Sequence, residues 1–250
     1  MPTLTHWIAL CSLACSCHAA TSASLVARYG LPVTQQFDAA PGIRITVEYG
    51  PDRMPVGVQL APPYYDPHIS AASTTMEADA LAEVASFFVP ASRRSGMSSF
   101  VFCSAYCSSS ETDFEFTITT RFSTRKTDSG AAAVTITSKR ELALTSGAIQ
   151  ARFGLPIVEQ FVADGDIELT AKYDATGKAA KIKVAALQPM QNLTALAVDN
   201  VLNELVPLFE RTGTGVHGIS SEMYDNVTIS RSTDGDMVQN ATVRWVVPSR

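Results

Sequence analysis

The side chains best suited to chemistry lie at residues 64–68 and 217. Residues 64–68 read Tyr-Tyr-Asp-Pro-His and set a carboxylate and an imidazole beside two phenols. Asp66, His68 and His217 would form the acid–base set of a hydrolase if the fold brought them within reach of one substrate. No serine or cysteine in a nucleophile pattern accompanies them. We therefore take Tyr64, Tyr65, Asp66, His68 and His217 as ligand-binding candidates and predict no catalytic residue.

Two further patterns resemble a cofactor site and a metal site. Gly213–Gly218 matches the GxGxxG fingerprint, which must follow a strand and open a helix. Here the segment follows a predicted helix and leads toward strands, so it indicates a flexible connection. Asp164, Asp166 and Glu168 alternate along the chain, but no EF-hand loop contains them, and an acidic turn before a strand is the ordinary interpretation. We predict neither a cofactor nor a metal.

The five cysteines divide between the N-terminal segment and a central one. Cys11, Cys15 and Cys17 precede residue 21, which leaves Cys103 and Cys107. An even pair in an exported protein favours a disulfide, and this separation permits a bridge in a turn but not along a straight strand. A zinc site normally has four ligands, and no histidine or second cysteine pair lies nearby in the sequence. We predict a disulfide between Cys103 and Cys107.

Residues 1–20 are typical of a secretory signal peptide. A short apolar run, Trp7–Cys17, is followed by small residues suited to a signal peptidase. The run is shorter than the roughly 20 apolar residues of a membrane span, and no other segment approaches that length. We predict a secreted or periplasmic protein without a transmembrane segment. The alternative is lipoprotein anchoring through Cys15 or Cys17, although neither has a leucine three residues upstream.

The composition predicts a folded protein and argues against nucleic acid as a partner. Of the 250 residues, 46% are hydrophobic and 17% are charged, which is a balance typical of globular domains. The net charge of −5 gives no general attraction to phosphate backbones or to anionic lipid. Short basic pairs at residues 93–94, 125–126 and 139–140 indicate solvated surface.

The chain is a tandem duplication. Residues 21–49 align without a gap with residues 145–173, at an offset of 124, and thirteen of the twenty-nine positions are identical. An internal repeat of this length indicates two copies of one structural unit. We predict repeats at residues 21–141 and 145–250. The linker near residues 142–146 is too short to let them separate, so an intimate pair is expected.

Both copies predict the same order of elements. A short helix ended by glycine precedes a hairpin, a longer helix kinked or ended by Val-Pro follows, and two more strands close the unit. The expected helices are 24–29, 148–153 and two that begin near residues 74 and 192; the expected strand pairs are 43–49 with 56–60, 114–122 with 134–138, 167–173 with 180–184, and 227–230 with 243–247. The predicted fold class is α+β: a two-layer helix-strand-strand-helix-strand-strand unit, duplicated in tandem, with antiparallel sheets and helices on one face.

The copies differ by insertions in the first one. Seven extra residues lie within Pro62–Thr74, around the 64–68 cluster, and six more precede the third predicted strand, around Cys103–Cys107. Loops tolerate insertions and also carry many binding sites. The insertion within Pro62–Thr74 is therefore a candidate for function, with length drift as the alternative.

Several motifs of the repeat resemble those of a group of secreted bacterial proteins for which no activity is established. They are Arg28–Pro32 (RYGLP), Arg152–Pro156 (RFGLP), Ile45–Asp52 (ITVEYGPD), the Val-Pro helices, and Tyr224–Arg231 (YDNVTISR). The resemblance implies export and this repeating unit, and it implies no reaction. The first copy reads Asp113–Thr120 (DFEFTITT) in place of the last motif, so a site that uses Asn226 or Arg231 would lie in the second copy only.

The sequence thus favours an exported, non-enzymatic binding or envelope-associated module, whose partner is a protein or a cell-envelope component. The alternatives are a secreted hydrolase of an undescribed type and a structural envelope protein. A meeting of Asp66, His68 and His217 within about 10 Å in one pocket would favour the hydrolase. The absence of any pocket would favour the structural protein.

Overall fold

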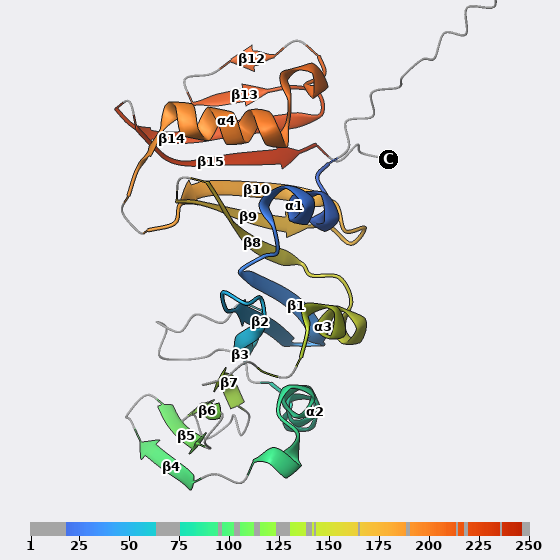
Figure 1. Cartoon of the computed structure of the whole chain (residues 1–250), viewed down its shortest axis with the longest axis vertical. Coiled ribbons are helices and arrows are strands. Elements are labelled where there is room, and N and C mark those ends of the chain that lie inside the picture. Colours follow the sequence, from blue (N-terminus) through green and yellow to red (C-terminus); the bar gives the residue numbers. More distant parts are fainter. Residues whose placement is uncertain are drawn as a thin grey trace, which may run out of the picture.

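The computed structural model describes most of the chain after residue 18 (Figure 1). The described residues are 19–63, 76–94, 97–102, 106–112, 116–123, 131–138, 142, 144–164, 166–188, 191–213, 215–217, 220–235 and 237–246.

Both copies contain two α-helices and several strands. The first copy has α1 (Ser22–Tyr29), β1 (Thr34–Ala40), β2 (Ile43–Tyr49), β3 (Pro55–Ala61), α2 (Ala78–Phe88), the 3-10 helix η1 (Ala91–Arg93), β4 (Met97–Phe102), β5 (Tyr106–Thr112), β6 (Phe116–Ser123) and β7 (Ala131–Ser138). The second copy has α3 (Ser146–Phe153), β8 (Val158–Ala163), β9 (Ile167–Tyr173), β10 (Ala179–Ala186), β11 (Leu193–Thr194), α4 (Ala195–Leu205), the 3-10 helix η2 (Leu208–Glu210), β12 (Val216–His217), β13 (Ser221–Met223), β14 (Val227–Asp234) and β15 (Met237–Trp245).

The predicted fold class is wrong, because the strands of both copies form one continuous antiparallel sheet. This 15-stranded sheet runs in the order β12-β13-β14-β15-β10-β9-β8-β1-β2-β3-β7-β6-β5-β4, and β11 pairs with β15. Each copy also has more strands than the six-element unit that the sequence predicted. The two-layer units merge because β1 and β8, which were not predicted, offer unpaired edges that satisfy each other's backbone groups.

The two copies meet about a pseudo-twofold axis between β1 and β8. Thr34 pairs with Gln160, Gln36 with Val158, and Gln35 with Glu159. Gln35 and Glu159 are equivalent positions at the offset of 124, so each faces its own counterpart. The antiparallel pairing of two equivalent strands is what a twofold relation between the copies requires.

The first helix of each copy packs on the core of the other copy. Leu25 of α1 belongs to the buried cluster that contains Phe161 of β8, whereas Ile149 of α3 belongs to the cluster that contains Phe37 of β1. In Figure 1, α1 lies against β8–β10 and α3 lies beside β1 and β2. The helices are thus exchanged across the axis, and each half of the molecule uses residues from both copies.

The same local signals delimit both short helices. Thr21 and Thr145 precede α1 and α3 and accept hydrogen bonds from the helix-start amides. Gly30 and Gly154 end them at φ of 79° and 84°, in the region that favours glycine. The helices predicted at 24–29 and 148–153 are confirmed and begin two residues earlier than expected.

The longer helices end at the Val-Pro pairs, where the sequence predicted either a kink or an end. α2 and α4 end at Phe88 and Leu205, directly before the Val-Pro pairs. α4 begins after Thr194, whose hydroxyl accepts a hydrogen bond from the amide of Ala197. The expected hydroxyl cap of α2, at Thr74, lies outside the described residues, and α2 follows Glu77, which makes no side-chain cap hydrogen bond.

Candidate functional site

Most of the sequence-predicted site residues lie outside the described part of the structure. This holds for Tyr64, Tyr65, Asp66, His68 and Cys103. His217 lies in β12, where its backbone pairs with Glu222, and Cys107 lies in β5, where its backbone pairs with Phe102. The meeting of Asp66, His68 and His217, and the disulfide, therefore stay predictions.

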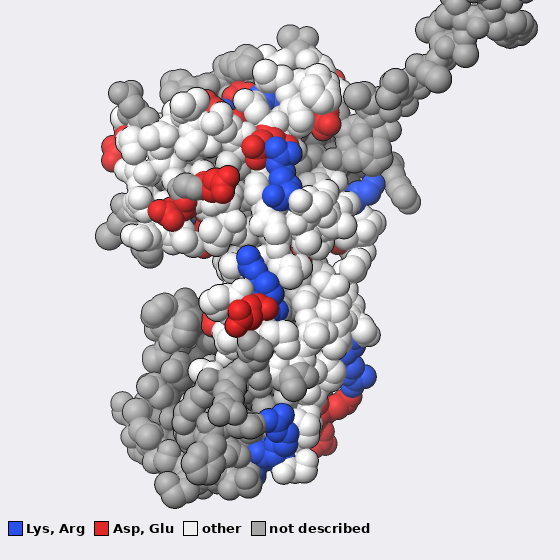
Figure 2. All heavy atoms as spheres, in the orientation of Figure 1, with Lys and Arg blue, Asp and Glu red and all other residues white. Residues whose placement is uncertain are grey.

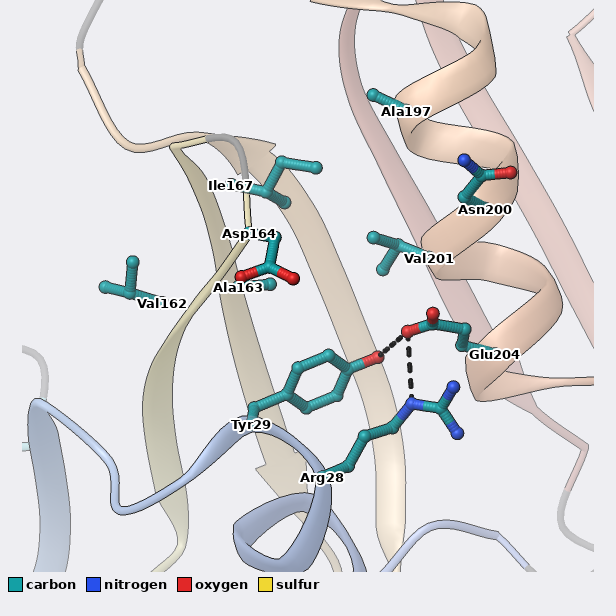
Figure 3. A pocket seen from close by; sticks show the side chains of 10 residues that line it. All are labelled: Arg28, Tyr29, Val162, Ala163, Asp164, Ile167, Ala197, Asn200, Val201 and Glu204. Atoms are coloured by element: carbon teal, nitrogen blue, oxygen red, sulfur yellow. Dashed lines mark hydrogen bonds and ion pairs between the residues drawn. The ribbon is translucent and has the colours of Figure 1, made fainter.

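The structure contains a pocket that the sequence did not predict, of about 580 Å³, between α1, α4 and the turn from β8 to β9 (Figure 3). Both copies contribute to it, because α1 is exchanged onto the second half. It is lined by Arg28, Tyr29, Val162, Ala163, Asp164, Ile167, Ala197, Asn200, Val201 and Glu204.

One end of the pocket is closed by a hydrogen-bonded group that joins α1 to α4. Glu204 Oε2 accepts a hydrogen bond from Arg28 Nε at 3.0 Å and one from the Tyr29 hydroxyl at 3.2 Å, and Figure 3 shows both bonds. The hydrogen bond from Arg28 lowers the pKa of Glu204, and burial raises the pKa of Tyr29. At neutral pH the carboxylate is thus ionised and the phenol protonated, which is the state that these bonds require.

The remaining polar groups of the pocket make no polar contact with the part of the chain that the structure describes. Asp164, from the turn after β8, and Asn200, from α4, are exposed, and neither makes an interaction with another described residue. Between them the buried Ile167 and Val201 supply an apolar surface. Because Arg28 and Glu204 neutralise each other, the charge open to a ligand is the Asp164 carboxylate.

The two positions that carry the contact of Tyr29 with Glu204 hold aromatic rings in the first half. α2 and α4 align at an offset of 117, so that Phe87 takes the place of Glu204, and Phe153 takes that of Tyr29. Phe153 packs edge-on against Phe87 at 5.1 Å between ring centroids and stacks with Phe88 at 5.9 Å. The two halves thus differ in the groups that join the exchanged helix to the longer one, which are packed rings in the first half and hydrogen-bonded polar groups in the second.

A second polar cluster connects α4 to β13 and β14, and explains part of the YDNVTISR motif. Arg211 and Arg231 both pair with Glu222, and Arg231 also pairs with Asp199 of α4 at 2.9 Å. Although burial raises it, the pKa of Glu222 is lowered overall, chiefly by the hydrogen bond from Arg231. The Tyr224 hydroxyl donates to Glu222 at 3.1 Å. These groups satisfy one another, so Arg231 positions α4 and faces no pocket ligand.

Asn226 of the same motif holds the segment after η2. Its side-chain amide donates to the carbonyl of Glu210 at 2.9 Å, and its side-chain oxygen accepts from the amide of Thr212 at 3.0 Å. Both contacts are to backbone groups, whose hydrogen-bonding capacity a folded protein must satisfy. The motif therefore has a structural role in the second copy.

The centre of the sheet contains a third polar group, buried at the pseudo-twofold axis. Gln35 Nε2 donates to Glu159 Oε1 at 2.7 Å. The hydroxyls of Tyr49 and Tyr173 donate to Gln35 and Glu159 respectively, each at 2.6 Å, and Ser146 of α3 donates to Gln35 at 2.9 Å. Burial raises the pKa of Tyr49 to about 12. This group joins the two halves and leaves no room for a ligand.

Among the described residues, no helix is long and apolar enough to cross a membrane, and no group of three or more His, Cys, Asp or Glu residues within them could hold a metal ion. No family model, curated protein or solved structure matches the chain.

Proposed function

We propose that this protein is an exported, non-enzymatic binding module that holds part of a protein or cell-envelope partner in the pocket between α1 and α4. Export rests on the predicted signal peptide at residues 1–20. The observation that carries the binding role is the pocket of about 580 Å³, one end of which is closed by the polar contact of Tyr29 with Glu204, at positions where the first half has the packed rings of Phe153 and Phe87.

The lining of the pocket defines the ligand group that fits. The Asp164 carboxylate and the Asn200 amide are free to bind a hydrogen-bond donor or a cation, and Ile167 and Val201 offer apolar contact. A side chain or small group with an apolar body and a cationic or donating end matches both parts. Lysine-like and arginine-like groups are of this kind.

Binding explains the pocket better than catalysis does. A general acid or base works best with a pKa near the operating pH. The shifted groups of this pocket move away from neutrality, because the pKa of Glu204 is lowered and that of Tyr29 is raised. Both groups are also engaged in holding α1 to α4.

The test uses pocket variants in a binding assay against extracts of the periplasm or culture medium, followed by titration of the purified partner. Ala197→Phe places a ring in the pocket, and Asp164→Asn removes its free charge. We expect Ala197→Phe to abolish saturable binding, and Asp164→Asn to weaken it about tenfold, since a hydrogen bond to a charged group contributes about 1.5–3 kcal/mol.

The matched control is Leu196→Phe, which puts the same ring on the neighbouring residue of α4, where the side chain is 72% exposed. This variant should bind as the unaltered protein does. Equal loss in both phenylalanine variants, or unchanged binding in Ala197→Phe, would exclude the pocket as the binding site. Turnover of a panel of ester, phosphate and glycoside substrates that is lost in His217→Ala would favour the hydrolase instead.

A further inference from the structure

The face of the sheet opposite the helices carries a cluster of four cations in its second half. The cluster consists of Lys172 on β9, Lys181 and Lys183 on β10, and Arg244 on β15. Each alternates along its strand with residues buried under the helices. All four side chains therefore project from the open face. We call them the basic cluster.

The strand register sets these charges directly beside one another. Lys181 on β10 pairs with Lys172 on β9 and with Arg244 on β15. Lys183 lies two residues further along β10. Directly opposed residues have Cβ atoms about 5 Å apart, and like charges at such positions are destabilising. The repulsion between these opposed cations therefore lowers the stability of the folded protein.

No described residue neutralises the basic cluster through an ion pair. Lys172, Lys183 and Arg244 are exposed and Lys181 is half-exposed, and none of the four has an ion pair or hydrogen bond to another described residue. The nearest carboxylate on β9, Glu168, accepts a hydrogen bond from Thr170 at 3.1 Å. On the helix-bearing face, by contrast, Figure 2 shows basic and acidic groups side by side, as in the pair of Arg28 with Glu204.

The first half provides an internal comparison. By strand pairing, the positions of the first half that correspond to the basic cluster are Glu48, Gly57, Gln59 and Thr137. They include one acidic residue and no cation. The same scaffold thus exists with and without the charges, although the chain as a whole has a net charge of −5. The cluster is not a requirement of the fold.

We propose that the basic cluster docks the second half of the sheet onto an anionic lipid bilayer. The surface is an extended sheet face and not a cavity, so it suits headgroup phosphates spread over a plane better than one enclosed anion. Lysine ammonium groups are point charges that accept many phosphate geometries. Each cation near an anionic membrane surface strengthens binding about fivefold. The pocket lies on the helix side, so this inference is independent of the proposed function.

The test is sedimentation of the purified mature protein with vesicles at about 50 mM and about 500 mM salt. One vesicle preparation is phosphatidylcholine alone, and the other is an equal mixture of phosphatidylcholine and phosphatidylglycerol. We expect binding to the mixed vesicles only, and only at low salt. Lys172→Gln combined with Lys181→Gln should weaken the partition constant about 25-fold, and replacement of all four cations by glutamine should abolish binding.

The matched control is Arg53→Gln combined with Lys178→Gln, which removes two cations outside the cluster and should change binding less than twofold. Circular dichroism verifies that each variant is folded. The proposal is overturned if folded protein fails to bind the mixed vesicles, binds pure phosphatidylcholine equally, or binds after all four replacements. Salt-sensitive retention of an acidic protein by the cluster, without vesicle binding, would assign it to a protein partner and also overturn the proposal.

Discussion

The buried contact at the centre of the sheet allows a quantitative test of how the two halves are joined. Glu159 is fully buried and accepts hydrogen bonds from Gln35 and Tyr173 at 2.7 Å and 2.6 Å. Glu159→Leu removes this acceptor, so that the buried Gln35 amide loses its acceptor and the Tyr173 hydroxyl keeps only its contact with Ser22. An orphaned buried donor costs about 1–3 kcal/mol, so we expect the free energy of unfolding to fall by about 1–3 kcal/mol through Gln35 and by a smaller amount through Tyr173.

The matched control is Glu159→Gln, which keeps the shape of the side chain and an oxygen that can accept from Gln35. Its amide can donate to the hydroxyl of Tyr173, so we expect a change of less than about 1 kcal/mol. Urea unfolding can be followed by the fluorescence of Trp245, which is buried and is the only tryptophan after the predicted signal peptide.

A double variant separates the two donors. Glu159→Leu combined with Tyr173→Phe lacks the Tyr173 hydroxyl and should recover the smaller part of the lost stability, leaving chiefly the cost of the unpaired Gln35 amide. Equal stability of Glu159→Leu and Glu159→Gln would refute the reasoning, because the hydrogen bonds between β1 and β8 would then contribute nothing to the joining of the halves.

Three further predictions concern charge and redox state. The contact with Arg28 lowers the pKa of Glu204, so this contact stabilises the fold above the ordinary pKa of the carboxyl group, 4.5, and is lost as the pH falls further. Thermal melts should therefore show that Glu204→Gln loses less stability below that pH than the unaltered protein does. Lys181→Gln should raise stability by a few tenths of a kcal/mol at low salt and not at about 1 M salt; an increase at both salt levels in urea titrations would contradict the repulsion. Cys103 and Cys107 should resist alkylation until a reductant is added, as measured by the mass of the mature protein; two thiols that alkylate without reductant would contradict the disulfide.

Local helix-capping signals predicted the two short helices, but the sequence pattern did not predict the central strands β1 and β8. Threonine caps and terminal glycines act within a few residues, so both helices could be placed from the sequence. The strands β1 and β8 were missed because their inward positions include Gln35 and Glu159, which interrupt the apolar alternation that identifies a half-buried strand. The structure explains these two buried polar residues, because Gln35 and Glu159 face each other and form a hydrogen bond.

The exchange of helices is a long-range property that a repeat cannot reveal by itself. α1 and α3 each bury one aliphatic residue at the same position, Leu25 and Ile149, and both end in Ala-Arg, an aromatic residue and Gly. Either helix would therefore be compatible with either core as far as the local sequence shows. The choice depends on the pairing of β1 with β8, which joins residues 124 positions apart.

The pocket did leave a signal in the sequence, at two positions where the copies differ. RYGLP and RFGLP differ at Tyr29 and Phe153, and the Val-Pro helices differ at Glu204 and Phe87, among other positions. In the second half one difference adds a hydroxyl to a ring and the other puts a carboxylate in place of a ring. Read separately these are ordinary substitutions. Their meeting in one site required the exchanged helix, which brings Tyr29 of the first copy to Glu204 of the second.

The difference between the two halves lowers the expected stability of the second half, which supports a function there. The rings of Phe87, Phe88 and Phe153 bury apolar surface, and each aromatic pair adds about 0.5–1.5 kcal/mol beyond that burial. At the equivalent positions the second half has Tyr29 and Glu204, and the exposed pair of Arg28 with Glu204 closes one end of the pocket; such pairs contribute little to stability. A repeat under selection for stability alone would favour the rings at both positions. The loss of packing on one side only is what we expect where that side binds a ligand.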